Sequence, residues 1–258
     1  MKMMKYFSLF LFILASTASN SVSSEELKFA TQDFAPFNYR INGKVSGPAA
    51  DIIRLVCSRV SVDCSFQLLP WRRAQKEVKD GNSHGLFVIG WNKKRSEWLH
   101  YSPPIMKTEY GFFAQDDSNL TYLQASDIAG LKVGVFGPSN TSNSLEKIKN
   151  QLIENGLKAI SIDMRPNDED GFKKLRAGRV DAVFSNRDVG YALLKKLNIK
   201  NVRYAGAQKK LKYYIGFSME HTDKNLVEKF NAELKGLYQQ GKIQEVLTSY
   251  QMESVDLE

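Results

Sequence analysis

A turn of small polar residues between a strand and a helix could bind an anion. The turn is Gly137-Pro138-Ser139-Asn140-Thr141; an apolar stretch, residues 131–136, precedes it, and a helix-periodic pattern over residues 145–152 follows. The first N–H groups of a helix have no carbonyl partner and carry partial positive charge, so they can hold a carboxylate or phosphate. Ser139 and Thr141 could instead serve only as helix caps.

Arg95 could hold the same kind of group. Its planar guanidinium matches a carboxylate with two parallel hydrogen bonds and stays charged at every physiological pH. Arg95 ends the basic run Lys93-Lys94-Arg95, so an exposed surface charge is the alternative interpretation.

The two cysteines, Cys57 and Cys64, are close in the sequence LVCSRVSVDCSF. An even number of cysteines in an oxidising compartment favours a disulfide. Cys57 ends an apolar helical stretch and Cys64 begins an alternating strand, so a bridge would join helix to strand across a short loop. A pair of free buried thiols is the alternative.

Other kinds of chemistry have little support. The three histidines, His84, His100 and His221, form no metal-ligand cluster with acidic residues, and we expect neither a metal nor a cofactor. The sequence shows no paired carboxylates and no Ser–His or Cys–His arrangement of recognisable spacing, so none of these patterns indicates an enzyme. The formal net charge of +8 comes from scattered basic residues, without the motifs of nucleic-acid-binding modules, so no nucleic-acid partner is expected.

The first residues predict export. Lys2 and Lys5 precede an apolar run, Tyr6–Ala15, and small residues follow from Ser16. This order is typical of a cleaved secretory signal peptide, which we assign to residues 1–23, and the run is shorter than a membrane-spanning helix requires. We therefore expect a periplasmic protein.

Strands and helices alternate along the rest of the chain, which predicts parallel sheets covered by helices. The pattern divides into two α/β blocks, the first interrupted by the second. We expect one lobe to comprise residues 24–113 and 209–258, and the other residues 114–208. Extended segments at residues 107–114 and 213–218 would connect them.

Five segments in this order carry a resemblance to a known family: FAPFNY (Phe34–Tyr39), GKVSGPAADI (Gly43–Ile52), KKRSEWLHYSPP (Lys93–Pro104), DIAGLKVGVFGPSNT (Asp127–Thr141) and LRAGRVDAVFSNRD (Leu175–Asp188). The chain resembles the family 3 extracellular solute-binding proteins, which serve polar amino-acid ABC transporters. The resemblance implies a type II periplasmic binding protein fold, with two α/β lobes joined by two crossing hinge strands and a ligand held between them. Some members carry a disulfide where this chain has its cysteine pair.

The resemblance also implies site residues. Arg95 occupies the position of the guanidinium that binds the ligand's carboxylate, and Ser139, Asn140 and Thr141 match the turn that holds the same group from the second lobe. Phe34 and Trp71 resemble the aromatic wall, with Phe37 equally interpretable as core. Arg73 follows Trp71 at a helix start and could also point into the cleft.

Two positions depart from the family pattern. Asn186 stands where amino-acid binders place the aspartate that receives the ligand's ammonium, and Gly90, followed by Trp91, stands where they place small hydroxyl residues. Both departures argue against an ordinary α-amino acid, although Asp33 or Asp188 could replace the missing charge.

The sequence thus favours a monomeric protein that captures a small carboxylate-bearing solute, an amino acid or a related polar molecule, by hinge closure for an ABC permease in the inner membrane. One alternative is a ligand sensor acting on a separate receptor. Another is a periplasmic dehydratase, which needs a catalytic acid or base that the sequence does not reveal.

Overall fold

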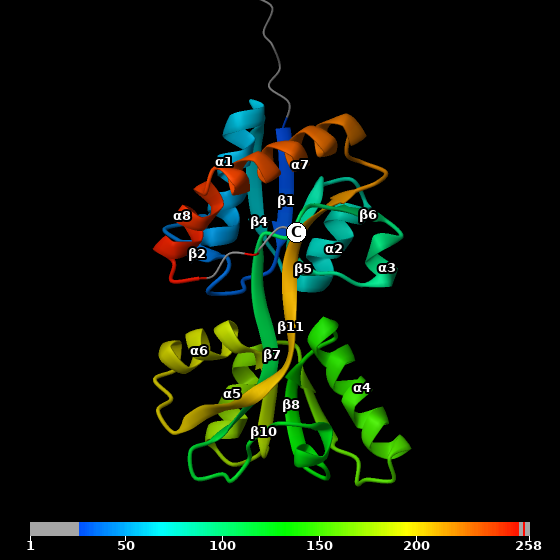
Figure 1. The fold of residues 1–258 in the computed structure, drawn as a ribbon, viewed down its shortest axis with the longest axis vertical. Coiled ribbons are helices and arrows are strands. Elements are labelled where there is room, and N and C mark those ends of the chain that lie inside the picture. Colours follow the sequence, from blue (N-terminus) through cyan, green and yellow to red (C-terminus); the bar gives the residue numbers. More distant parts are fainter. Residues whose placement is uncertain (1–25, 253–254, 256–258) are drawn as a thin grey trace, which may run out of the picture.

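The computed structural model describes residues 26–252 and Val255, and these form two lobes stacked along the long axis of the molecule (Figure 1). The predicted signal peptide, residues 1–23, lies outside the described residues. Within these residues, no helix combines the length and apolar character that a membrane crossing needs.

Lobe 1 is a parallel sheet covered on both faces. Strands β1 and β4 pair in parallel, as do β1 and β5. Helices α1, α7 and α8 pack on one face of this sheet and α2 on the other, each over its own apolar core. The bounds are β1 (Glu26–Thr31), β2 (Tyr39–Ile41), β3 (Lys44–Ser46), α1 (Pro48–Val60), β4 (Asp63–Leu68), α2 (Trp71–Lys79), β5 (Gly85–Gly90), α3 (Lys93–Ser96), β6 (Leu99–Tyr101), α7 (Lys224–Gln239) and α8 (Lys242–Ser249).

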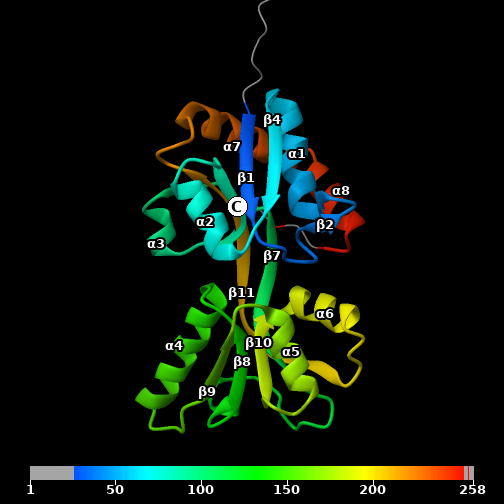
Figure 2. The same ribbon diagram turned by 180° about the vertical axis from the view of Figure 1, so that it is seen from behind.

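Lobe 2 repeats this plan. Its parallel strands β8, β9 and β10 are covered by α4 on one face and by α5 and α6 on the other, again over two separate cores (Figure 2). The bounds are η1 (Ala125–Ile128), β8 (Lys132–Phe136), α4 (Asn140–Glu154), β9 (Ser161–Arg165), α5 (Asp168–Arg176), β10 (Ala182–Asn186) and α6 (Arg187–Lys196).

Two long antiparallel strands run through both lobes. Strand β7 (Met106–Gln115) pairs with β11 (Val202–Ser218) from Val202 opposite Gln115 to Tyr213 opposite Met106. In lobe 1 β11 pairs with β5, and in lobe 2 β7 pairs with β10, so one continuous set of strands, in the order β4-β1-β5-β11-β7-β10-β8-β9, joins the lobes (Figure 1).

The sequence pattern predicts a strand at residues 202–205 and a separate extended segment at residues 213–218, where the structure has the single strand β11. The residues between them include Gly206 and a lysine-rich stretch, residues 207–212, which lacks an apolar alternation. Pairing with β7 keeps this stretch extended, with the register shifting on either side of Gly206. The lobe boundaries expected near residues 113 and 208 fall inside the two shared strands.

Parallel strands place their carboxyl ends on one edge of a sheet, and in both lobes this edge faces the other lobe. The residues that follow these strands, and the amino-terminal ends of α2 and α4, therefore meet in the space between the lobes (Figures 1 and 2). The fold thus brings together segments that are far apart in the sequence.

The disulfide between Cys57 and Cys64 is present, with the two Cα atoms 6.2 Å apart. It joins the last turn of α1 to the second residue of β4 across the turn at Ser61, whose φ of 58° is left-handed. This agrees with the helix-to-strand bridge that the local pattern predicted.

We expect the double substitution Cys57→Ala/Cys64→Ala to lower the free energy of unfolding by about 2 kcal/mol, because the bridge closes a short loop in the unfolded chain. Denaturant unfolding followed by circular dichroism measures this difference. Dithiothreitol should lower the stability of the wild type to that of the variant and leave the variant unchanged. A wild type insensitive to reduction would contradict the assignment.

Candidate functional site

Three adjoining cavities lie between the lobes, and Trp71 contributes to all of them. The smallest, of about 40 Å³, shares lining residues with both of the others and is here called the inner cavity. A larger cavity of about 780 Å³ opens beside α2, α3 and α4, and another of about 600 Å³ opens beside α5 and α6.

The inner cavity brings together most of the residues that the sequence singled out. Its lining includes Phe34, Trp71, Gly90, Arg95, Ser139, Asn140 and Thr141. Thr31 and Gln32 at the end of β1, and Tyr110 and Tyr213 from the shared strands, complete much of the remaining wall. The two tyrosines carry no signal in the sequence that separates them from ordinary core aromatics.

Arg95 is a buried cation without a carboxylate partner among the described residues. Its side chain is held by a hydrogen bond from Nη1 to the Gly90 carbonyl, at 3.0 Å, and by the ring of Trp71, whose centre lies 5.0 Å from the guanidinium carbon. The residue is only 8% exposed, and burial lowers the pKa of its guanidinium, although an arginine remains charged at neutral pH. A buried charge of this kind gains stability from an anionic partner.

The start of α4 faces the same cavity from lobe 2. Ser139 caps the helix, since its Oγ accepts a hydrogen bond from the Ser142 N–H at 3.1 Å. Asn140 and Thr141 follow in the first turn, where N–H groups have no carbonyl one turn earlier to bond with. The capping role and the anion-binding role proposed for this turn are thus compatible.

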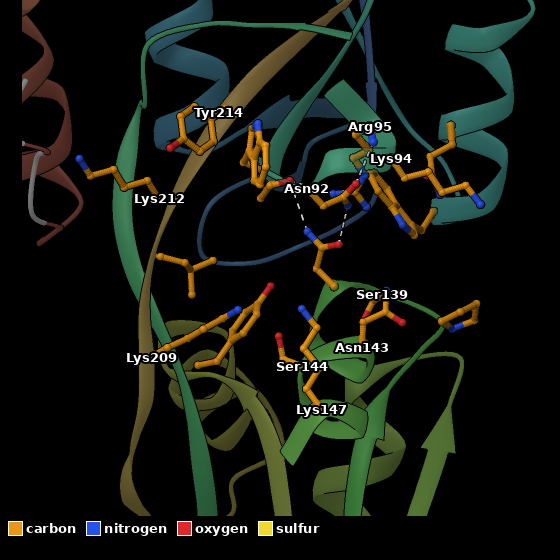
Figure 3. A pocket seen from close by; sticks show the side chains of 18 of the residues that line it. Asn92, Lys94, Arg95, Ser139, Asn143, Ser144, Lys147, Lys209, Lys212 and Tyr214 are labelled. Carbon is orange, nitrogen blue, oxygen red and sulfur yellow. Dashed lines mark hydrogen bonds between the residues drawn. The ribbon is translucent and has the colours of Figure 1, made fainter. Parts of the chain in front are cut away.

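The two lobes touch directly at the mouth of the inner cavity. Asn92 donates to Oδ1 of Asn140 at 2.8 Å, and Nδ2 of Asn140 donates to the Gly90 carbonyl at 3.3 Å (Figure 3). A Cβ atom at position 90 would lie 3.0 Å from Nδ2 of Asn140, so the glycine permits this close approach. Val88 of β5 has a left-handed φ of 55° and no pairing partner in β11, so it forms a β-bulge in this strand.

Two predicted site residues lie elsewhere. Arg73 is exposed, bonds to Glu77 across one helical turn and lines none of the three cavities, whereas its neighbour Arg72 faces the larger cavity. Successive side chains on a helix point about 100° apart, so the arginine that faces the cleft is Arg72 rather than the predicted Arg73. Phe37 is buried core and packs against the Tyr213 ring.

Asn186 also lies outside the cavity linings, and all of its hydrogen-bonding capacity is used. Its Nδ2 donates to Thr108 and to the Tyr213 hydroxyl, and its Oδ1 accepts from the N–H groups of Asp188 and Val189 at the start of α6. The residue is 1% exposed. Here the amide joins the shared strands to α6.

Asp168 is a cavity-lining carboxylate that was not among the site residues predicted from the sequence. It lines the cavity of about 600 Å³ at the first turn of α5, and among the described residues it forms no ion pair. Burial raises its pKa to about 6, against the opposing effect of a hydrogen bond from the Ser185 hydroxyl at 2.8 Å. Its place directly after β9, at the edge that faces lobe 1, was the available signal.

Comparison with known sequences agrees with this geometry. A profile of the bacterial extracellular solute-binding proteins, family 3, matches residues 27–253. The chain belongs to this family. The family resemblance drawn from the five sequence segments is confirmed.

Curated relatives of this solute-binding protein are distant. The probable amino-acid-binding protein YxeM of Bacillus subtilis is 24% identical over 231 residues, covering 89% of this chain and 84% of its own. The octopine-binding periplasmic protein of Rhizobium meliloti is 24% identical over 222 residues, covering 76% and 72% of the two chains.

Solved structures confirm the type II two-lobed α/β fold. A structure determined for glutathione import through GshT and the cystine ABC importer TcyBC of Streptococcus mutans superposes with a TM-score of 0.79. It is 20% identical and covers 90% of this chain and 98% of its own.

We expect Asp168→Asn to stabilise the ligand-free protein at pH 7.5, by roughly 1–3 kcal/mol, because the partly buried carboxylate is charged there. The folded state holds the proton more tightly than the unfolded state, so the gain should shrink as the pH falls through 6 and vanish near 4. Thermal unfolding across this pH range provides the measurement.

Asp170→Asn is the matched control, since Asp170 lies in the same first turn of α5 and shares its helix-terminal field. Equal pH profiles for the two variants would contradict a burial effect at Asp168.

Proposed function

We propose that this protein captures a small carboxylate-bearing solute, an amino acid or a related polar molecule, between its lobes and delivers it to an ABC permease in the inner membrane. It would do so as an exported, monomeric protein of the periplasm, after removal of residues 1–23. Family membership supports solute binding. The single observation that carries the ligand class is the buried Arg95 guanidinium, which faces the start of α4 across the inner cavity.

A carboxylate would lie between these two groups. Arg95 would supply a bidentate pair of hydrogen bonds from lobe 1, and the first N–H groups of α4 would supply bonds from lobe 2. Because the two halves of the anion site belong to different lobes, a bound carboxylate would favour the arrangement in which the lobes are close together.

An ammonium on the same ligand would need acceptors other than residue 186. Two groups that line the cavities could accept a hydrogen bond from an ammonium. The Gly90 carbonyl lies at the inner cavity, and the Asp168 carboxylate lies at the adjoining cavity of about 600 Å³. The names of the relatives, which refer to amino acids and to octopine, are consistent with a polar solute that carries a carboxylate.

Opening of the lobes would break the contacts that now join them beside the inner cavity. This cavity measures only about 40 Å³, so the Asn92–Asn140 and Asn140–Gly90 bonds would have to break for a solute to enter. The shared strands β7 and β11 would bend to allow this.

A thermal-shift screen of amino acids and small carboxylates should find a solute that raises the midpoint temperature by several degrees at about 100 times its dissociation constant. Arg95→Ala should weaken that solute roughly 30-fold or more in isothermal titration calorimetry, because it removes one partner of a buried charged contact. The ligand-free variant should unfold at the same or a higher temperature, since an unpaired buried charge is lost.

Arg73→Ala is the control, because it removes the same charge from an exposed site outside all three cavities. The proposal fails when Arg95→Ala binds the solute as tightly as the wild type does.

A further inference from the structure

The cavity of about 780 Å³ is lined by cations from both lobes and from a shared strand. They come from α2, α3, α4 and β11, and they are Arg72, Lys79, Lys94, Arg95, Lys147, Lys209 and Lys212. Among the described residues that line this cavity, none is Asp or Glu. The adjoining cavity of about 600 Å³ differs, since it contains Asp33, Asp168 and Glu169 beside Arg40 and Lys196.

These seven cations also lack carboxylate partners. Within residues 26–252, none of them forms an ion pair, whereas many other cations of the chain do; Lys196, for example, lies 3.0 Å from Glu169 in the other cavity. A solvated surface normally mixes both signs of charge. A concave wall of one sign concentrates the opposite charge from solution.

Lys147 of α4 and Lys209 of β11 are two members of this set whose charges repel each other. Their side chains enter the cavity from different elements, as Figure 3 shows. Partial desolvation, and then the charge of Lys147, lower the pKa of the Lys209 ammonium, whose Nζ lies 5.7 Å from the centre of the Tyr110 ring. An anion between them would relieve this repulsion.

Aromatic side chains line the same space. Trp71, Trp91, Trp98, Tyr110 and Tyr214 contribute to the wall, and Trp91 is 60% exposed. Such rings offer an apolar platform to the uncharged part of a solute. The cavity adjoins the Arg95 site directly, because Arg95, Ser139 and Asn140 line both spaces.

We propose that this basic cavity is a second anion subsite for the same solute, so that the protein selects molecules with two or more anionic groups, carboxylate or phosphate. One anion would bind at Arg95 and the start of α4. The other would bind between Lys147 and Lys209, with the remaining cations attracting the solute from solution. This inference rests on the proposed function and adds the charge of the ligand to it.

Two series of probes vary charge on a constant frame. The first is L-alanine, L-aspartate and O-phospho-L-serine, and the second is propionate, succinate and propane-1,2,3-tricarboxylate. All three tryptophans of the chain line this cavity, so intrinsic fluorescence reports its occupancy. We expect affinity, measured at constant ionic strength, to rise with each added negative charge along both series, and to fall more steeply with added salt for the more highly charged probes.

Lys147→Met/Lys209→Met should weaken the tightest multiply charged probe roughly 10- to 100-fold and change a singly charged probe less than about threefold. The matched control is Lys149→Met/Lys210→Met, which removes two charges from the same helix and strand outside the cavity. Iodide should quench the tryptophans of the wild type more strongly than caesium does, and this preference should fall only in the Lys147/Lys209 variant.

The outcomes separate this inference from the proposed function. If singly charged members bind and added anionic groups bring no gain, or the Lys147/Lys209 variant binds like its control, the second subsite is refuted while the Arg95 site stands. If no member of either series binds and iodide shows no preference, both are refuted.

Discussion

The antiparallel pairing of β7 with β11 is the constraint on which the rest of the molecule depends. These two strands belong to the sheets of both lobes, and β5 and β10 build outward from them on opposite sides. Tyr110 and Tyr213, at the floor of the inner cavity, are residues of these same strands and are almost fully buried. The floor of the ligand site is therefore part of the hinge, whereas Arg95 and the start of α4 are carried by separate lobes. In the proposed site, a change in lobe angle would alter the spacing between Arg95 and the start of α4, while Tyr110 and Tyr213 would stay in place.

Arg95 and Asp168 are charged side chains of the cleft that lack partners of opposite charge among the described residues. Arg95 is buried against Trp71 and the Gly90 carbonyl, without a carboxylate, and the helix start opposite adds further positive potential. Asp168 lies in the other flanking cavity, equally without an ion pair among the described residues. Each arrangement costs stability in the free protein, and a solute that supplies the missing charge restores it. Stability and specificity are linked here through the same few side chains.

The order of elements and most of the site could be predicted from the sequence, because strand and helix periods and the turn at residues 137–141 are local signals. The unbroken course of β11 could not, since its exposed lysines carry no strand pattern and only pairing with β7 keeps them extended. Arg73 was predicted in the cleft where the structure has Arg72, because one helical step decides which of two adjacent arginines faces inward. Asp168 was missed because its burial comes from residues distant in the sequence. The gathering of seven cations from four elements is invisible in a chain whose basic residues look evenly scattered.

The structural role of residue 186 depends on its side chain being an amide rather than a carboxylate. The Asn186 amide donates to the Tyr213 hydroxyl and to Thr108, whose own hydroxyl donates to Asp188 at 2.6 Å. A carboxylate in this place could accept but not donate, so Thr108 could not keep its bond to Asp188 and also accept from residue 186. The amide thus ties both shared strands to the start of α6, beneath the site rather than within it. Gly90 also makes contacts within the protein, because the absence of a side chain there admits Asn140, and its carbonyl accepts hydrogen bonds from both Asn140 and Arg95. Asn186 and Gly90 are therefore both engaged in contacts within the protein, and in the proposed site the positive groups of the cleft would be the principal means of selecting a solute.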